Sequence, residues 1–159
     1  ANGLAKGQYI PHVIEPSAGV DRLILALITN AYSETTKTDE KGKSETTFVM
    51  KFHPRVAPNK VGVLPVLKNK PELVKKALEV RDLLRPWLNV YYDDGGSIGK
   101  RYARQDEAGT PFCVTVDFDT LGEKGPELLD TVTLRYRDDG RQERLKISEL
   151  RDWLLARVR

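Results

Sequence analysis

From residue 60 onward, short apolar runs alternate with amphipathic segments, and this alternation constrains the fold more than any other feature. Residues 60–67 and 88–92 are apolar runs of strand length. Between them, residues 72–84 carry apolar side chains three or four positions apart, as on one face of a helix. Residues 97–107 also predict a helix. Strands that alternate with helices of about 10–15 residues imply crossover connections and a sheet that is at least partly parallel.

The remaining elements extend this sheet. Residues 112–118 alternate as a third strand, and residues 130–137 as a fourth that pairs with it in antiparallel fashion through a Gly/Pro-rich connection. Residues 147–158 predict a closing helix. For the helix at 97–107, Ser97 is the candidate N-cap and Gly109 the stop. The predicted fold is therefore α/β, with a mixed, mostly parallel open sheet and about three covering helices.

The segment before this sheet has a different character. Residues 12–15 predict a short strand, and residues 23–28 are apolar all round, which favours a buried helix capped by Ser17 or Asp21. Residues 33–47 are polar and balanced in charge, so they predict a loop, a hairpin or a linker. This polar stretch is the one plausible domain boundary.

Composition excludes several classes of protein and of site. Because the formal net charge is only +3, the chain permits a nucleic-acid partner without demanding one. One cysteine excludes an internal disulfide, and two histidines exclude a zinc site of the usual kind. We expect Cys113 to be a buried apolar residue, and Asp117 and Asp119 to serve a turn or an ion pair rather than a metal. No signal peptide or membrane-spanning run is visible, so we expect a cytoplasmic location without membrane contact.

Two groups of residues carry the chemical signals. The first joins Glu15 at the predicted strand end, Gly19, which allows close backbone approach, and Arg22 in the first helical turn. An arginine here suits a phosphate because its planar fork donates two hydrogen bonds, and Glu15 suits an amine. A capped helix with a surface arginine explains the same residues.

The second group is basic, with tyrosines between the cations. Cations can hold phosphates, while aromatic and guanidinium planes stack on unpaired bases. This pattern is typical of RNA binding, and also of an ordinary solvated surface. Its members are Lys100, Arg101, Arg104, Arg135, Arg137, Arg141, Arg144 and Lys146, with Tyr91, Tyr92, Tyr102 and Tyr136.

These two groups lie within a longer resemblance. The run PHVIEPSAGVDRLILAL resembles the third signature motif of class II aminoacyl-tRNA synthetases, in the form used by the dimeric glycyl-tRNA synthetases. The stretches FHPRVAPNKVGVLP, DDGGSIGKRYARQDEAGTPFCVTVDFDT and DTVTLRYRDDGRQERLKISEL resemble the anticodon-binding domain of the same enzymes, in the same order. The resemblance runs from about Tyr9 to Trp153.

The resemblance implies roles for residues in the first group. Arg22, the motif arginine, would be the catalytic residue that contacts the ATP phosphates, with Gly19 also at the ATP. Glu15 and Ser17 would recognise the glycine substrate. The partners implied are glycine, ATP and tRNA-Gly, with Mg²⁺ at the phosphates in the full-length enzyme.

In the second group, the resemblance implies anticodon contacts. Lys100 and Arg101 come from the GKR segment, and Arg137 and Asp138 from the RYRD segment. Tyr102 or Tyr136 could stack on a base.

The resemblance also implies a division of the chain. Residues 1–32 would be the C-terminal strand-helix remnant of the catalytic domain, residues 33–47 a linker or hairpin, and residues 48–159 the anticodon-binding domain. Motifs 1 and 2, which carry dimerisation and a second arginine, are not in this sequence. We therefore expect this fragment of an ATP-dependent ligase to bind tRNA but not to catalyse, with no metal or cofactor of its own. The full-length enzyme would form a homodimer through its catalytic domain.

Other readings remain open. A non-catalytic relative of the anticodon-binding domain would act as an accessory nucleic-acid or protein-binding subunit. A class II synthetase for threonine, proline or histidine would share the same domain. A small α/β enzyme with its own active site is the weakest alternative, because no pair of nucleophile and base stands out.

Overall fold

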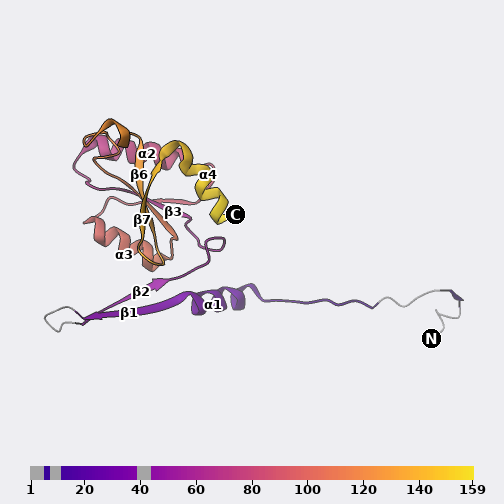
Figure 1. Ribbon diagram of the computed structural model, residues 1–159. Coiled ribbons are helices and arrows are strands. Elements are labelled where there is room, and N and C mark those ends of the chain that lie inside the picture. The colour runs from indigo at the N-terminus through magenta and orange to yellow at the C-terminus, as the bar shows by residue number, and fades with distance from the viewer. Residues whose placement is uncertain (1–5, 8–11, 39–43) are drawn as a thin grey trace.

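Helix α1 (Val20–Ala31) runs directly into a two-stranded hairpin. The hairpin consists of the antiparallel strands β1 (Tyr32–Thr38) and β2 (Ser44–Met50), in register from Tyr32 opposite Met50 to Thr38 opposite Ser44. The structure is a computed structural model, and it describes residues 6–7, 12–38 and 44–159. In Figure 1, α1 and the hairpin form an elongated arm below the sheet.

Within the polar stretch at 33–47, residues 33–38 and 44–47 therefore belong to this hairpin, one of the structures expected for the stretch.

Five strands form the main sheet in the order β4-β3-β5-β6-β7. Strand β3 is parallel to β4 and to β5, whereas β5 with β6 and β6 with β7 are antiparallel. The sheet is mixed, as predicted, but parallel and antiparallel pairings are equal in number, so the expectation of a mostly parallel sheet was wrong. The strands are β3 (Val61–Pro65), β4 (Val90–Tyr92), β5 (Phe112–Val116), β6 (Thr131–Tyr136) and β7 (Gln142–Lys146).

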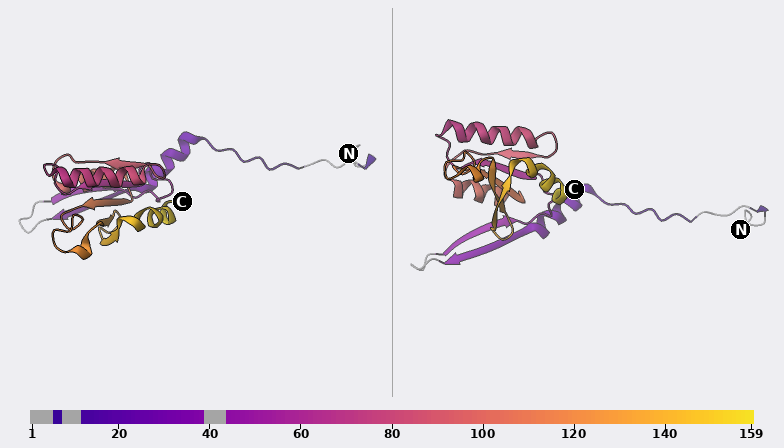
Figure 2. Two further views of the ribbon diagram at one scale, coloured as in Figure 1. Left: turned by 90° about the horizontal axis from the view of Figure 1, so that it is seen from above. Right: turned by 45° about the horizontal axis from the view of Figure 1, so that its top comes forward.

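Three helices cover the sheet, which agrees with the number predicted. Helices α2 (Pro71–Leu84) and α4 (Ile147–Val158) lie on one face, and α3 (Ile98–Ala108) lies on the other. The hairpin lies beyond α3, so α3 is between the sheet and the arm (Figure 2). A short 3₁₀ turn, η2 (Pro126–Leu128), precedes β6.

The core lies between the sheet and the helices α2 and α4. Helix α2 buries Leu73, Ala77, Val80 and Leu84, which recur at the spacing of one helical face. They pack against apolar side chains of the sheet and of α4, including Val63, Val114, Leu134 and Leu154. The spacing of apolar residues in the sequence therefore correctly predicted which face of α2 is buried.

The N-terminal predictions fared differently. Residues 12–15 form no strand, and the chain is extended and exposed from residue 12 to residue 19. A strand needs a hydrogen-bonded neighbour, and none pairs with this segment among the described residues. Helix α1 begins after Gly19 without a side-chain cap, so the capping roles of Ser17 and Asp21 were also wrong.

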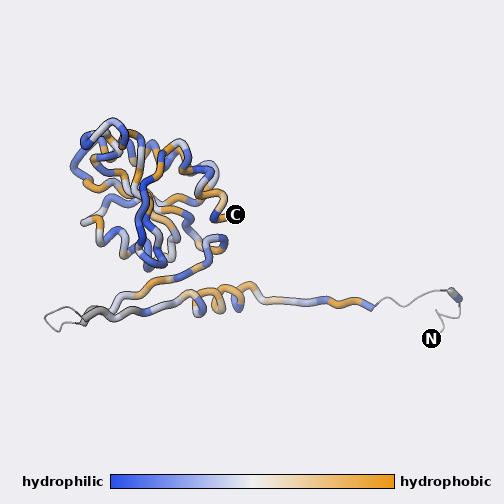
Figure 3. Tube along the Cα trace, in the orientation of Figure 1, coloured by the Kyte–Doolittle hydropathy of each residue, from blue (hydrophilic) through white to orange (hydrophobic). Residues whose placement is uncertain are grey.

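Helix α1 is not buried, contrary to expectation. Only Ala31 is buried, and the large apolar side chains of the helix are 41–69% exposed. Figure 3 shows this helix as the most continuous apolar segment of the arm. In the described part of the chain, a cavity of about 290 Å³ separates Ile24, Leu27 and Ile28 from the segment containing Phe52 and Val56. An apolar helix with so little covering it is a surface that suits a further partner.

Within the described residues, no helix combines the length and the apolar character needed to cross a membrane.

Candidate nucleic-acid interface

A crevice opens at the carboxyl ends of β3 and β4. The chain leaves β3 toward α2 on one face and leaves β4 toward α3 on the other, so the two connections diverge. Open α/β sheets bind ligands at such a divergence. The cavity here is about 440 Å³, and its walls are Val66, Leu67, Lys68 and Asn69 on one side and Gly96, Ser97, Ile98 and Arg101 on the other.

The N-terminus of α3 forms one wall of this crevice. Ser97 is the N-cap residue of the helix, as predicted, although its side chain makes no capping hydrogen bond. The first backbone N–H groups of a helix have no partner within the helix and favour negative charge. Lys100, on the first turn, is exposed. Gly109 ends the helix at φ +78°, as predicted.

An ion pair holds the loop before α3 in place. Asp93 Oδ1 accepts a hydrogen bond from the Gly95 amide at 2.9 Å. Asp93 Oδ2 accepts from Arg104 Nε at 2.9 Å and from Arg104 Nη2 at 2.6 Å. Arg104 Nη2 also donates to the Gly95 carbonyl at 2.6 Å. The loop is therefore fixed on the helix that follows it.

Arg101 is buried, with only 1% of the residue exposed. Its Nη2 donates to the Gly96 carbonyl at 2.7 Å, and its Nη1 donates to the Pro65 carbonyl. The side chain thus ties the end of β3 to the loop before α3. Its Nε is buried and has no hydrogen-bond partner among the described residues. The guanidinium is inside the wall of the crevice rather than on its surface.

Arg137 and Asp138 lie at the opposite end of α3 from Lys100 and Arg101. Arg137 Nη1 donates to the carbonyl of Gly109, the residue that ends the helix, at 2.8 Å. Because α3 has 11 residues, its ends are about 16 Å apart at about 1.5 Å per residue. The structure therefore does not bring the two predicted anticodon-contact pairs together. The Asp138 side chain is exposed, whereas that of Arg137 is buried.

Much of the remaining basic group is engaged in ion pairs within the fold. Arg135 donates to both carboxylate oxygens of Asp106, at 2.7 and 2.9 Å, and stacks on Tyr102. The Tyr136 ring packs edge-on against Phe112 and Trp153. Beside the crevice, the exposed cations are Lys100 and Lys68. Lys68 and Asn69 were not among the predicted site residues, although a polar LKNK run between a strand and Pro71 is a recognisable signal.

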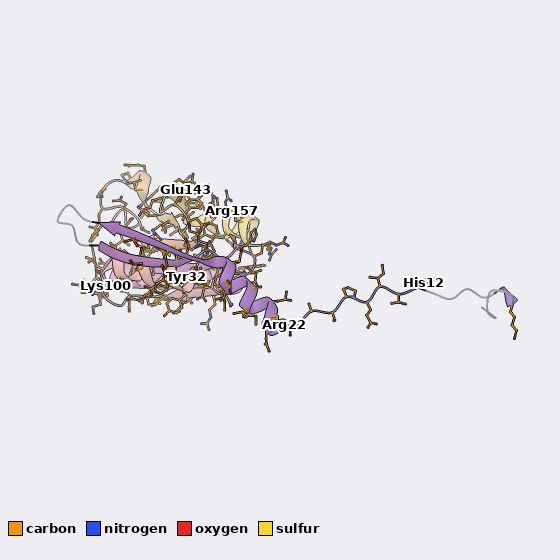
Figure 4. All side chains as sticks on the ribbon, turned by 90° about the horizontal axis from the view of Figure 1, so that it is seen from below. His12, Arg22, Tyr32, Lys100, Glu143 and Arg157 are labelled. Atoms are coloured by element: carbon orange, nitrogen blue, oxygen red, sulfur yellow. The ribbon has the colours of Figure 1, made fainter. Side chains whose placement is uncertain are left out.

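The N-terminal group lies far from the crevice. Glu15, Ser17 and Gly19 are exposed on the extended segment. Arg22 is exposed on the first turn of α1, and its aliphatic stem comes within 3.9 Å of the Cβ position that Gly19 lacks. In Figure 4, Lys100 lies at one side of the folded part of the chain and Arg22 at the other side, where the extended segment toward His12 begins.

The sheet and its covering helices can be assigned to a protein family. Residues 60–157 match the family described as the anticodon binding domain. The chain belongs to this family. It is 47% identical to the glycine–tRNA ligase of Clostridium kluyveri over 157 residues, which are 99% of the chain and 31% of that protein. The Thermobifida fusca glycine–tRNA ligase is 48% identical over 95% of the chain and 31% of its own length. The Deinococcus radiodurans glycine–tRNA ligase is 49% identical over 94% of the chain and 30% of its own length.

Two ranges of similarity can therefore be distinguished. The anticodon-binding domain match begins at Lys60, at the start of the sheet, and includes the crevice and all of α3. The anticodon-binding domain expected from the resemblance is therefore confirmed, and the chain is similar to glycine–tRNA ligases over nearly its whole length. The chain spans about 31% of the length of the relatives it matches.

In this anticodon-binding domain, Asp117 and Asp119, which follow β5, form ion pairs within the fold, as predicted. Asp117 accepts hydrogen bonds from Arg144, Thr133 and Thr120. Burial disfavours the charged carboxylate, but these hydrogen bonds outweigh it and lower the pKa of Asp117 below its usual value. Nowhere in residues 6–7, 12–38 and 44–159 do three His, Cys, Asp or Glu side chains come together to hold a metal.

Cys113 is buried in the middle of β5, also as predicted. Burial raises the pKa of its thiol to about 12. Because the thiolate is the reactive form of cysteine, this thiol is inert near neutral pH.

Proposed function

We propose that this chain is the tRNA-recognition portion of a glycine–tRNA ligase, and that its crevice faces the anticodon loop. The complete enzyme would activate glycine with ATP and transfer it to tRNA-Gly. The observation that carries the proposal is the crevice between β3 and α3, open at the sheet edge and flanked by exposed cations, in a chain that belongs to the anticodon-binding domain family.

The crevice has the chemistry that an unpaired RNA loop needs. Lys100 and Lys68 bind phosphates, and the N-terminus of α3 adds a partial positive charge. The walls contributed by Leu67 and Ile98 are apolar and can contact the flat face of a base. We assign Arg101 the task of holding the two walls in place. Asp138 is about one helix length away, so it would meet a different nucleotide.

The N-terminal segment would complete its site only within the whole enzyme. There, Glu15 and Ser17 would recognise glycine, and Arg22 with Gly19 would meet ATP. The exposed apolar surface of α1 and the greater length of the relatives support such an assembly, which would also carry the homodimer contacts. We place the Mg²⁺ at the ATP phosphates, in the part of the enzyme that completes this site.

The accessory-subunit alternative is less well supported. An accessory protein has no need for residues that recognise glycine and ATP, yet the similarity to glycine–tRNA ligases covers 99% of this chain.

The test is binding of the 159-residue chain to a tRNA that accepts glycine, measured by filter binding at several salt concentrations. We expect the logarithm of affinity to fall linearly with the logarithm of salt, and Lys100→Ala to reduce that slope by about 0.7–0.9. Lys75→Ala is the matched control, because Lys75 is also an exposed lysine but lies on α2, on the other face of the sheet. Equal binding to a tRNA for another amino acid, or no binding at low salt, would contradict the proposal.

A second assay separates binding from catalysis. The chain should show no glycine-dependent exchange between ATP and pyrophosphate, because its N-terminal residues are exposed on an extended segment and a lone helix. Measurable exchange would contradict the assignment of Glu15, Ser17 and Arg22 to a site completed elsewhere in the enzyme.

A further inference from the structure

Arg137 connects three segments that are distant in the sequence. Its Nη2 donates to the carbonyl of Phe52, just after the hairpin, at 2.8 Å. Its Nη1 donates to the carbonyl of Gly109, at the end of α3, at 2.8 Å. Its Nε donates to Asp138, in the turn after β6, at 2.7 Å. Every nitrogen of the guanidinium therefore contacts a part of the fold.

The burial of Arg137 shows that this arrangement is internal. Its side chain is 2% exposed, against 63% for Asp138. A guanidinium in this position cannot present its donor edge to an RNA while these bonds persist. Removing it would leave the carbonyls of Phe52 and Gly109 without that donor, which is costly for buried groups.

Gly109 allows the hairpin segment to approach. A Cβ atom at residue 109 would lie 2.4 Å from Phe52 Cδ2 and 2.9 Å from the Met50 carbonyl oxygen. Residue 109 also has φ +78°, where glycine is favoured. The end of β2 thus packs on the end of α3 because residue 109 has no side chain. We call Phe52, Gly109 and Arg137 the Arg137 joint.

Elsewhere, two cavities lie between part of β2 and the sheet domain. Their volumes are about 270 and 250 Å³, and they lie on either side of the Arg135–Asp106 ion pair. Thr47 and Val49 of β2 line both cavities. Gaps of this size lose packing contacts that would otherwise hold two elements in one orientation. The Arg137 joint, in contrast, is a close contact, hydrogen-bonded between the domain and the segment just after the arm.

We propose that Arg137 is a positioning residue, which fixes the orientation of the arm formed by α1 and the hairpin relative to the anticodon-binding domain. Helix α3 then links two sites: the crevice at its first turn and the Arg137 joint at its last. In a complete ligase, the joint would set where the anticodon crevice lies relative to Glu15, Ser17 and Arg22. This last consequence rests on the proposed function, whereas the joint itself does not.

The direct test measures the arm's orientation in the 159-residue chain. Spin labels are attached at Thr46→Cys on β2 and Lys75→Cys on α2, both exposed positions, while the buried Cys113 remains unlabelled. Pulsed electron paramagnetic resonance then gives the distribution of label distances. We expect a single narrow distribution for the parent chain, a distribution at least twice as broad for Arg137→Gln, and an intermediate one for Arg137→Lys.

Arg144→Gln is the matched control. Arg144 is also an ion-paired arginine of this sheet, but its hydrogen bonds to described residues go to Asp117, Thr131 and Thr133, none of them in the arm. It should lower the melting temperature without broadening the distances. A distribution for Arg137→Gln as narrow as that of the parent would overturn the proposal. If Arg137→Gln does not fold, Arg137→Lys decides the question in the same way.

Function supplies the second readout. In a glycine–tRNA ligase that contains this chain, Arg137→Gln should raise the KM for tRNA at least threefold and leave glycine-dependent pyrophosphate exchange unchanged. Binding of the isolated anticodon stem-loop RNA should change less than twofold. Lost stem-loop binding with unchanged label distances would instead make Arg137 a direct RNA contact and overturn the positioning role. Failure of the parent chain to bind tRNA would reject the proposed function but leave the distance result standing.

Discussion

Arg104 and Asp93 form a two-point ion pair across the loop that leads into α3, with Nε and Nη2 of the arginine 2.9 and 2.6 Å from one carboxylate oxygen. The same carboxylate accepts the Gly95 amide. This arrangement preorganises the loop beside Lys100. Preorganised contacts give affinity because less ordering is needed when the partner binds.

Asp93→Ala should therefore weaken tRNA binding even though Asp93 itself is an anion. Loss of the ion pair frees the loop beside the crevice, and we expect an affinity loss of about 1 kcal/mol, or roughly fivefold. Filter binding at fixed salt measures it. Asp152→Ala is the control, because Asp152 is ion-paired with Arg151 on α4 and should not alter affinity. Tighter binding by Asp93→Ala would mean that charge repulsion outweighs loop order.

Acid should destabilise the domain through Asp117. Since the folded-state pKa of Asp117 is lowered, the carboxylate contributes stability above its unfolded pKa, and that contribution is lost as pH falls through the folded pKa. Urea unfolding should show stability falling below about pH 4. Asp117→Asn should cost about 2 kcal/mol at pH 7 and flatten this dependence on pH. A variant with the parent's full acid dependence would place the titrating group elsewhere.

A glycine inside α3 and the glycine that ends this helix should respond oppositely to replacement by alanine. Gly109→Ala places a Cβ against Phe52 and requires a left-handed residue, so it should destabilise by at least about 1–2 kcal/mol. Gly99→Ala meets no atom within 4 Å and gains helix propensity, so stability should rise by up to about 1 kcal/mol. Thermal unfolding measures both changes. Equal effects of the two substitutions would contradict the close approach at Phe52.

The Cys113 thiol should report opening of the sheet. With its pKa raised to about 12 by burial, it should resist iodoacetamide at pH 8 in the folded chain and react fully in urea. Mass spectrometry counts the modified fraction. Rapid labelling without denaturant would show that β5 is more accessible than its burial indicates.

Local pattern predicted most of the fold, because periodicity decides which residues of an amphipathic element turn inward. The faces of α2 and the strand β5 follow from it directly. Strand β7 escaped prediction because QERLK is a polar edge strand, and its structure comes from pairing with β6 rather than from its own propensity. The exposure of α1 was also unpredictable. An apolar sequence indicates that a helix should be covered by other residues, but not whether those residues belong to the same chain.

The candidate site was predictable in type but not in detail. Lys100 was predicted as an anticodon contact from the GKR segment of the resemblance, and the structure places it exposed on the first turn of α3. The burial of Arg101 and Arg137 is not local. Both long side chains turn inward to carbonyl groups of residues 36 and 85 positions away in the sequence, and only the folded chain reveals these partners.

The two edge strands of the main sheet, β4 and β7, are protected from pairing in different ways. Strand β4 has only three residues, and β7 is built largely of polar and charged residues, among them Glu143, Arg144 and Lys146. Short or charged edges discourage pairing with a strand of another molecule. A chain shortened to begin near residue 51 would thus lose the apolar helix α1 while keeping both protected edges. Such a piece should serve as a portable RNA-recognition module that stays monomeric when fused to an unrelated protein.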